Sequence, residues 1–343
     1  MKKFKISYLS ISPTMKTAII TDGNSTLGMG HVYQAITLAG ELLKKIDERS
    51  KIFFITKSDL IVIDRLSETG FDVYQFPDDD AILNALVNEA PDRIIFDKLD
   101  VSPLLAKQIK ETIGCKLIIF TNLTMANRYA DMTVLADIGS NFENICEKNA
   151  ISGGIHYYGP KYWILRPEFF IYTKRTKKPL SIVRNVMLIF GGADQSNLTS
   201  EVLNELLRMS STFEITVVVG AAFTHQEELD AVIEQNRKTQ STFQIVYNLK
   251  EVAETMHKSD VVFASPGLSF FEALAVGTPV LGFHQNELQR DVYKGYLTTL
   301  DKSELFRLSS IIENKSFIFP DDPFVASMKI GQGKDELIHA ILS

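Results

Sequence analysis

The sequence predicts an α/β protein with two doubly wound, Rossmann-like domains that face a cleft. Short apolar runs rich in β-branched residues alternate with longer amphipathic stretches, an order typical of parallel sheets covered by helices on both faces. The alternation stops once, over residues 159–184, and then starts again. A length of 343 residues also suits two domains better than one. Such sheets bind ligands beyond the carboxyl ends of their strands, so we expect the site in the cleft.

The first half of the chain predicts six strands. They are Thr17–Thr21, Lys51–Thr56, Asp72–Gln75, Arg93–Asp97, Lys116–Phe120 and Met132–Leu135. Amphipathic stretches such as Val32–Ile46 and Ala81–Glu89 lie between the strands and predict helices.

Residues 159–184 contain three prolines and a basic cluster, which is typical of a solvated linker. The cluster consists of Lys174, Arg175, Lys177 and Lys178. Beyond it we expect strands at 185–190, 214–220, 243–247, 260–264 and 279–283, and helices at Leu198–Met209, Glu227–Lys238, Val252–Ser259, Phe270–Val276 and Asp335–Leu342. The expected organisation is a first domain over 1–165, a linker over 166–184, a second domain over 185–328 and a terminal helical segment over 329–343.

Composition excludes several functional classes. A net charge of −6 gives no general attraction to nucleic acid or to anionic membranes. Cys115 and Cys146 lack metal-site spacing and are too few for a disulfide framework, so we expect a cytoplasmic protein. The basic N-terminus is not followed by a long apolar run, which argues against a secretory signal. No stretch approaches the ~20 apolar residues of a membrane span.

A glycine-rich turn follows the first expected strand. Asp22 ends the strand region, Gly28 and Gly30 allow a tight turn, and a helix is expected to start near His31. A helix N-terminus favours anions and disfavours a protonated histidine, so His31 could serve there as a neutral base. The alternative is an ordinary βα unit with a structural histidine.

Two further loops have a composition that suits a nucleotide. Gly191 and Gly192 follow a strand, and Asp194, Ser196 or Asn197 can cap the next helix. Residues 264–269 open a helix that carries Glu272, and a carboxylate so placed can accept from two ribose hydroxyls. The alternatives are a plain βα turn for the first loop and an early-helix acid for Glu272.

With these loops in view, the chain resembles the GT-B superfamily of nucleotide-sugar enzymes. It is most similar to the branch that contains the pseudaminic-acid pathway hydrolase and the spore-coat polysaccharide biosynthesis proteins. Six stretches carry the resemblance: LGMGHV (27–32), MANRYAD (125–131), YGPKYWILRPEF (158–169), FGGADQSNLT (190–199), ASPGLSFFEALAVGTPVLGFHQNELQ (264–289) and KIGQGKDELIHAIL (329–342). By analogy, the terminal helix would cross back to the first domain.

The resemblance implies a metal-independent hydrolase, without a cofactor, that removes UDP from an acetamido-deoxyhexose. His31 would activate water, and Asp22 would orient His31 or the sugar. Substrate would also meet Gly28, Gly30, Asp97, Asn127, Arg128, Gln285, Asn286 and Gln289. UDP would be held by Gly191, Gly192, Leu249, Gly267, Leu268, Ser269 and Glu272.

The chain departs from the family pattern on the sugar side. Gln34 stands where the family usually has arginine, Lys98 and Leu99 replace a His-Tyr pair, and Thr121 and Asn122 replace two aspartates. Buried polar groups decide which hydroxyl or amide pattern a pocket accepts, so a different sugar is expected and a hydroxyl acceptor is an alternative to water.

Three functions therefore stay open: a UDP-sugar hydrolase, a glycosyltransferase with a UDP-sugar donor, and a non-catalytic UDP-sugar binding protein. The expected partner is a UDP-sugar, with no nucleic acid and no transmembrane segment. Only the transferase interpretation involves contact with a membrane surface. In that case the basic extension over residues 1–16 is the candidate segment for the contact.

The remaining polar and aromatic candidates have simpler interpretations. We expect His257 and His284 to be structural or surface residues, and Tyr162 and Trp163 to pack the domain junction. The acidic turn at residues 78–80 lacks further metal ligands in the sequence.

Overall fold

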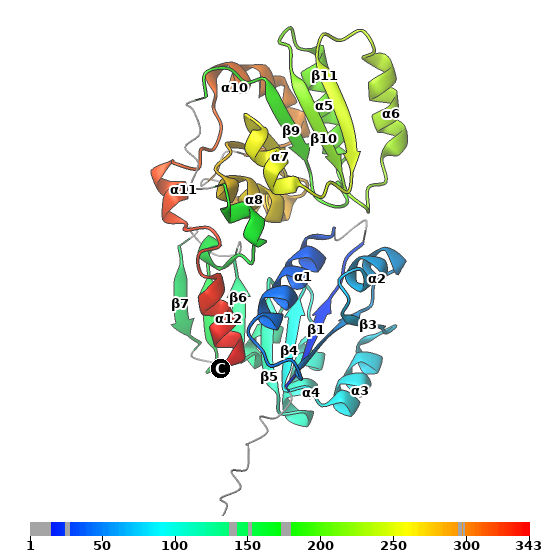
Figure 1. Cartoon of the computed structure of the whole chain (residues 1–343), viewed down its shortest axis with the longest axis vertical. Coiled ribbons are helices and arrows are strands. Elements are labelled where there is room, and N and C mark those ends of the chain that lie inside the picture. The colour runs from blue at the N-terminus through cyan, green and yellow to red at the C-terminus, as the bar shows by residue number, and fades with distance from the viewer. Residues whose placement is uncertain are drawn as a thin grey trace, which may run out of the picture.

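The computed structural model describes residues 15–24, 28–136, 143–149, 153–172, 180–293, 297 and 299–343. The N-terminal extension up to residue 14 and the basic linker cluster lie outside these residues. Two mainly parallel sheets form two domains, one above the other in Figure 1. This confirms the predicted fold class.

The first sheet has the strand order β3-β2-β1-β4-β5-β6-β8-β7. Its strands are β1 (Lys16–Thr21), β2 (Lys51–Thr56), β3 (Asp72–Gln75), β4 (Arg93–Asp97), β5 (Lys116–Phe120), β6 (Met132–Leu135), β7 (Ile145–Lys148) and β8 (Ile155–Tyr158). All neighbours pair in parallel except β7, which runs antiparallel to β8. The chain order reverses between β1 and β4, where doubly wound sheets leave a crevice at the carboxyl ends.

The second sheet has the strand order β11-β10-β9-β12-β13-β14, and all its pairs are parallel. Its strands are β9 (Asn185–Ile189), β10 (Glu214–Val219), β11 (Thr242–Tyr247), β12 (Val261–Ala264), β13 (Val280–Phe283) and β14 (Thr299–Leu300). Every strand expected from the sequence is present with its ends within one residue. Strands β7, β8 and β14 were not expected; they are two to four residues long, and β7 is exposed throughout.

Helices connect the parallel strands. They are α1 (Gly30–Leu43), α2 (Leu60–Ser67), α3 (Asp79–Glu89), α4 (Pro103–Thr112), α5 (Leu198–Arg208), α6 (Gln226–Gln235), α7 (Val252–Lys258), α8 (Leu268–Val276), α9 (Glu287–Tyr293), α10 (Leu308–Asn314), α11 (Pro323–Ser327) and α12 (Lys334–Leu342). Short 3₁₀ turns are η1 (Met125–Tyr129), η3 (Pro160–Tyr162), η4 (Pro167–Phe170) and η5 (Lys302–Arg307). Among the described residues, no helix combines the length and apolar character needed to cross a membrane.

The chain crosses between the domains at two places. Tyr162 packs in the core of the first domain, against Tyr157, whereas the next residue, Trp163, packs in the second domain against Phe271. Helix α12 follows the second domain in sequence but buries Leu337, Ile338 and Ile341 in the first (Figure 1). Burial of three aliphatic side chains contributes several kcal/mol at about 1.5–3 kcal/mol each.

Two cations hold the carboxyl end of α12. The Arg93 side chain is 4% exposed and donates from Nε to the Ile341 carbonyl (2.8 Å) and from Nη2 to the Leu342 carbonyl (2.6 Å). Lys116 Nζ donates to the Ala340 carbonyl at 2.6 Å. These donors satisfy carbonyls that a helix end leaves without intrahelical partners, and their charge complements the helix dipole.

The Arg93→Met variant tests this anchor. Charge-assisted hydrogen bonds are lost, so we expect the free energy of unfolding to fall by about 2–3 kcal/mol and amide exchange in α12 to accelerate. Thermal unfolding and hydrogen-exchange mass spectrometry measure the two effects. Arg184→Met is the matched control, because Arg184 pairs with Glu214 on an exposed surface and its loss should change stability by less than about 0.5 kcal/mol. Unchanged exchange in α12 would contradict the anchor.

Candidate active site

The turn between β1 and α1 meets the second domain. Met29 is fully buried and precedes α1, and a Cβ placed on Gly192 would lie 2.7 Å from the Met29 Cβ. A Cβ on Gly220 would in turn lie 2.5 Å from the Gly192 backbone. Since real Cβ atoms do not approach so closely, only glycine permits this contact. The glycine loop of the second domain therefore lies against the turn that starts α1.

Gly28 shapes the same turn from within. Its φ of +78° is a conformation that side chains rarely adopt. Its N–H donates to the Asn24 carbonyl at 2.9 Å, and the Asn24 N–H donates to the Gly28 carbonyl at 3.3 Å. This closure ends the loop just before Met29, and α1 begins at Gly30 without a side-chain cap.

His31 lies in the first turn of α1 and is held by a carboxylate from β4. Its Nδ1 lies 2.8 Å from Asp97 Oδ1, and the Asp97 side chain is fully buried. The other oxygen, Asp97 Oδ2, accepts from Gln34 Nε2 at 2.9 Å. The register of β1 against β4 places Asp97 beside Thr21, at the edge where α1 begins. A histidine hydrogen-bonded to a buried carboxylate is a common arrangement for a general base.

Asp22 is bonded to Lys98 and to the turn after β2, not to His31. Its Oδ2 lies 2.5 Å from Lys98 Nζ, and its Oδ1 accepts from the Lys57 N–H at 2.7 Å and from Thr56 Oγ1 at 3.1 Å. Burial opposes ionisation of this carboxyl, but Lys98 and the other donors outweigh it and hold the pKa of Asp22 below its ordinary value. The carboxylate bonded to His31 is Asp97, so the expectation that Asp22 orients His31 was wrong, whereas a contact of Asp22 with the sugar stays a prediction.

The Asp22–Lys98 ion pair lies at the carboxyl ends of β1 and β4, since Asp22 directly follows β1 and Lys98 directly follows β4. Lys98 also contacts Asp100 Oδ1 at 3.1 Å. Burial disfavours its ammonium form, yet the two carboxylates raise the pKa of Lys98 above its ordinary value. Because removal of either partner would leave a buried charge unpaired, at a cost of about 3–5 kcal/mol, the pair is a fixed part of this edge.

The polar side chains that follow β5 make hydrogen bonds within their own loop and to the loop after β4. Thr121 is buried at a φ of +54°, a strained conformation for a β-branched residue. The amides of Asn122 and Asn127 bond to each other, with Asn122 Nδ2 donating to Asn127 Oδ1 at 2.9 Å. Asn127 was expected to contact substrate, but its amide is committed to this loop. Arg128 is exposed, with its guanidinium over the Tyr129 ring.

In the second domain, the first glycine loop is capped by its own carboxylate. Asp194 is 3% exposed and accepts from the Leu198 N–H (2.9 Å) and the Thr199 N–H (2.8 Å) at the start of α5. Burial raises the pKa of Asp194, against the effect of these donors. Of the three possible caps named from the sequence, Asp194 is the one that caps α5. Gly191 and Gly192 therefore border a helix end that already holds a negative charge.

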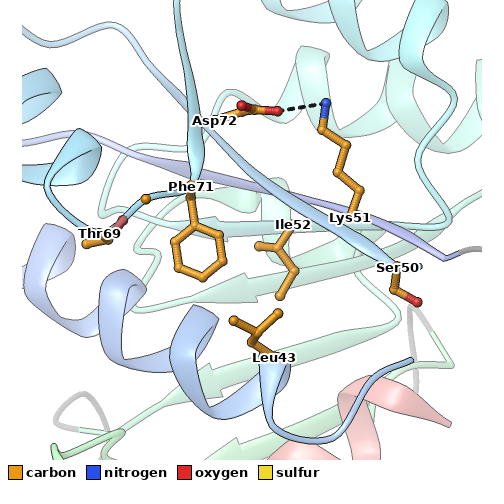
Figure 2. A pocket seen from close by; sticks show the side chains of 8 residues that line it. Leu43, Ser50, Lys51, Ile52, Thr69, Phe71 and Asp72 are labelled. Carbon is orange, nitrogen blue, oxygen red and sulfur yellow. Dashed lines mark ion pairs between the residues drawn. The ribbon is translucent and has the colours of Figure 1, made fainter. Parts of the chain in front are cut away.

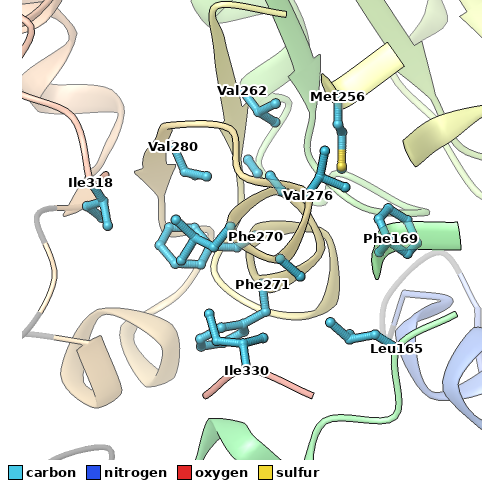
Figure 3. Close-up of a cluster of buried hydrophobic side chains, with 14 of the residues drawn as sticks. Leu165, Phe169, Met256, Val262, Phe270, Phe271, Val276, Val280, Ile318 and Ile330 are labelled. Atoms are coloured by element: carbon cyan, nitrogen blue, oxygen red, sulfur yellow. The ribbon is translucent and has the colours of Figure 1, made fainter. Parts of the chain in front are cut away.

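Helix α8 has no such cap. Gly267 precedes it at a φ of +142°, without a capping side chain, so Leu268 and Ser269 begin the helix with backbone donors that no cap satisfies. Behind this end, α8 is buried among apolar side chains from β12, β13 and the linker, including Phe169 and Leu165 (Figure 3). An uncapped N-terminus on a rigid helix is suited to an anion.

Glu272 lies one turn further along α8 and is only partly compensated. It is 4% exposed, and its nearest cation is Arg166 from the linker, whose Nη2 lies 3.6 Å away. Burial raises the pKa of Glu272 to about 7, although Arg166 acts in the opposite direction. Arg166 is itself shared with Glu168 at 3.1 Å. A buried carboxylate with one distant partner can still accept hydrogen bonds from a ligand.

The residues after β13 mainly hold neighbouring loops. Gln285 Nε2 donates to the Phe190 carbonyl and to Ser265 Oγ, each at 2.8 Å. Gln289 Nε2 donates to the Pro266 carbonyl at 2.8 Å, and the Gln289 N–H donates to Asn286 Oδ1 at 2.9 Å. The amides of Gln285 and Gln289 therefore tie the loops after β9 and β12 together, and their contact with the sugar stays a prediction.

Other sequence candidates have structural surroundings. Leu249 follows β11 and packs partly buried on the second-domain core, His257 stacks on Tyr172, and His284 Nε2 lies 3.7 Å from Asp301. In the acidic turn, Asp78 caps α3 and Asp79 pairs with Lys57 at 2.9 Å. Within the described residues, no group of three or more His, Cys, Asp or Glu side chains is arranged to hold a metal.

A shallow pocket lies at the opposite edge of the first sheet. It has a volume of about 320 Å³ and is lined by Leu43, Ile52 and Phe71, with the Lys51–Asp72 ion pair (2.9 Å) at its rim (Figure 2). Lys51 and Asp72 begin β2 and β3, so this pocket lies at the amino ends of the strands. It is separate from His31, which lies at the carboxyl ends.

Two contacts of the site were not predicted from the sequence. From the sequence we expect Asp97 to contact substrate, not His31. Arg166 lies in the stretch YGPKYWILRPEF (158–169), which predicts no role for its side chain. Strand order brings both Asp22 and Asp97 to the edge where α1 begins, but it does not say which carboxylate meets His31. The contact of Arg166 with Glu272 could not be predicted either, since it depends on how the linker folds over α8.

Comparison with known proteins agrees with this architecture. No family model matches the chain. It is 40% identical over 331 residues to the uncharacterized protein MJ1062 of Methanocaldococcus jannaschii; the match covers 95% of this chain, which spans 66% of the length of that relative. It is 27% identical over 332 residues to the spore coat polysaccharide biosynthesis protein SpsG of Bacillus subtilis, covering 92% of this chain and 93% of SpsG.

Solved structures show the same fold at low sequence identity. Acinetobacter baumannii MurG aligns with a TM-score of 0.60 at 13% identity, over 95% of this chain and 99% of MurG. Anabaena HepE in complex with UDP-glucose aligns with a TM-score of 0.55 at 13% identity, over 95% and 98%. The UDP-GlcNAc 2-epimerase of Neisseria meningitidis aligns with a TM-score of 0.58 at 11% identity, over 96% of this chain and 100% of the epimerase. The chain therefore has the GT-B fold.

Proposed function

We propose that this protein is a UDP-sugar hydrolase that releases UDP from a modified hexose. The observation that carries the proposal is the 2.8 Å contact between His31 Nδ1 and the buried carboxylate of Asp97, at the turn that meets the glycine loop of the second domain. The closeness of this pair to the contact between Met29 and Gly192, where the two domains meet, supports a role for His31 as the base. The solved structure of HepE with UDP-glucose, which shares the fold, supports a UDP-sugar as the ligand class.

In the proposed reaction, His31 Nε2 takes a proton from water as the water oxygen attacks the anomeric carbon. The bond between that carbon and the β-phosphate oxygen breaks, and its electron pair leaves with UDP. Asp97 stabilises the imidazolium that forms, as a buried carboxylate does for a catalytic histidine. A positioned base contributes about 10²- to 10⁴-fold. The products are the free sugar and UDP.

The second domain would supply the nucleotide site. The uncapped start of α8, at Gly267, Leu268 and Ser269, would donate backbone N–H groups to the diphosphate and stabilise its charge as it leaves. Glu272 would accept from the two ribose hydroxyls. Gly191 and Gly192 would border the diphosphate, and the backbone near Leu249 would meet uracil.

We further propose that the sugar carries acetamido and deoxy groups and that the product enters surface polysaccharide or nonulosonic acid synthesis. The likeness to SpsG, named for spore coat polysaccharide biosynthesis, supports this setting. The Asp22–Lys98 pair and the Gln34–Asp97 contact lie at the edge that would face the sugar. They replace polar groups usual in the family, which supports a sugar different from that of the pseudaminic-acid hydrolase.

A glycosyltransferase is the second candidate. Structural relatives such as the calicheamicin glycosyltransferase CalG4 share the fold with a TM-score of 0.59, at 12% identity over 96% of this chain and 99% of CalG4. The same His31–Asp97 pair would then deprotonate an acceptor hydroxyl. Turnover that requires an added acceptor distinguishes this function from hydrolysis, and UDP-sugar binding without any product would indicate a non-catalytic protein.

The His31→Asn variant separates binding from chemistry. Asparagine keeps a polar side chain but removes the base, so we expect UDP release to fall at least ~100-fold while the affinity for UDP changes less than about twofold. Calorimetry with UDP and a coupled assay for released UDP measure the two effects. The exposed His339→Asn is the control and should change neither. Full turnover in His31→Asn would refute the assignment of the base.

Glu272 predicts a pH-dependent affinity for UDP. Burial raises its pKa to about 7, so below that pH the folded protein holds a neutral carboxyl that cannot accept from both ribose hydroxyls. We expect the affinity for UDP to weaken by up to about tenfold per pH unit below 7 and to level off above it. Calorimetric titrations of wild type and Glu272→Gln with UDP at several pH values measure this affinity. In the variant, the only remaining pH dependence should be that caused by ionisation of UDP itself.

The matched ligand is 2′-deoxy-UDP, which offers one ribose hydroxyl and should bind wild type with a weaker pH dependence. Protein stability provides a check without ligand. Since the folded pKa lies above the ordinary 4.5, ionisation of Glu272 opposes folding, and wild-type stability should fall as pH rises from 4.5 through about 7. A stability profile unaffected by Glu272→Gln would refute the raised pKa, and an unaffected UDP profile would refute the ribose contact.

A further inference from the structure

Gln34, on α1, contacts the same carboxylate as the candidate base His31. It lies three residues after His31, on the same face of the helix, and is 3% exposed. Its Nε2 donates to Asp97 Oδ2 at 2.9 Å, while Asp97 Oδ1 lies 2.8 Å from His31 Nδ1. One buried carboxylate therefore bridges two side chains of α1, with a separate oxygen for each.

The chemistry of these groups fixes where protons lie. An amide nitrogen only donates, so Asp97 Oδ2 must accept. With Asp97 ionised, Oδ1 also accepts, and His31 Nδ1 must carry the proton. The lone pair of the neutral imidazole then lies on Nε2. We propose that Gln34 is a positioning residue: its neutral amide holds Asp97 in this orientation and so keeps His31 in the tautomer with a basic Nε2.

The neutrality of the Gln34 amide matters because it leaves the negative charge of Asp97 available to stabilise protonated His31. A cationic side chain at position 34 would also donate to Asp97, but its charge would offset the carboxylate that stabilises protonated His31. Gln34 satisfies Oδ2 without that opposition. The other charged groups at this edge, Asp22, Lys98 and Asp100, are paired with one another. Asp194, from the facing loop, caps α5.

This inference rests on the proposed function only for the statement that His31 is the base; the tautomer can be measured without any substrate. Long-range ¹H–¹⁵N correlation spectra of the six histidines, recorded on the full chain at neutral pH, report it directly. The His31 signals are assigned by their loss in His31→Asn. We expect wild-type His31 to carry its proton on Nδ1. A proton on Nε2 instead would overturn the inference with no further variant.

Two substitutions test the role of Gln34 itself. Gln34→Leu removes the donor at similar volume, and we expect the single His31 tautomer to be lost. Gln34→Glu keeps the shape but replaces the amide donor by a carboxyl beside Asp97, and we expect the His31 signals to change. Gln108→Leu, on α4 of the same domain, is the control and should leave the His31 signals unchanged. An unchanged His31 spectrum in both Gln34 variants would overturn the inference.

Kinetics then separate positioning from a merely structural role. In Gln34→Leu we expect kcat for UDP release to fall about 10- to 100-fold, while KM and the affinity for UDP stay within about twofold. A parallel loss of kcat and UDP affinity would instead indicate a structural role and overturn the inference. If wild type releases no UDP from any UDP-sugar, the proposed function fails, while the spectra still decide the tautomer and the role of Gln34.

Discussion

The close approach of Met29 to Gly192 is the constraint on which the rest of the site depends. Because position 192 cannot hold even a Cβ without displacing Met29, the turn that begins α1 lies directly against the first glycine loop of the second domain. His31 follows Met29 by two residues, so this contact sets how the second domain faces the candidate base. The linker and α12 reinforce the arrangement, since each packs a segment into the opposite domain.

The charged and polar groups of the site are of two kinds: those paired within the protein and those that a ligand would complete. The Asp22–Lys98 pair and the Asp194 cap have their partners within the protein, so neither requires a ligand. The start of α8 and Glu272 differ, because the helix lacks a capping side chain and the carboxylate has one cation at 3.6 Å. An anion and a diol would complete these two groups. The hydrogen-bonded series His31–Asp97–Gln34 would provide the base in the proposed reaction.

The fold was predictable because its signal is local. Runs such as Arg93–Asp97 and Lys116–Phe120 are apolar and bounded by turn residues, and both were assigned correctly. Strand β7 has no such signal, since its side chains are exposed on both faces. The site was less predictable. The positions of His31 and Glu272, early in helices that follow strand ends, could be predicted. The choice of Asp97 over Asp22 as the partner of His31 depends on which way each side chain leaves its strand. Likewise, Gln285 and Gln289 bind carbonyls brought close only by the folded second domain.

The most direct test of the central claim is UDP release from a panel of UDP-amino sugars, followed by ³¹P and ¹H NMR with EDTA present and no acceptor. We expect at least one acetamido-deoxyhexose donor to give stoichiometric UDP and free sugar. Because water displaces UDP directly, the first-formed sugar should show a single anomeric configuration, inverted relative to the donor, before mutarotation. Tight binding of the panel with no release, followed by turnover once an acceptor hydroxyl is added, would contradict hydrolysis and establish a transferase.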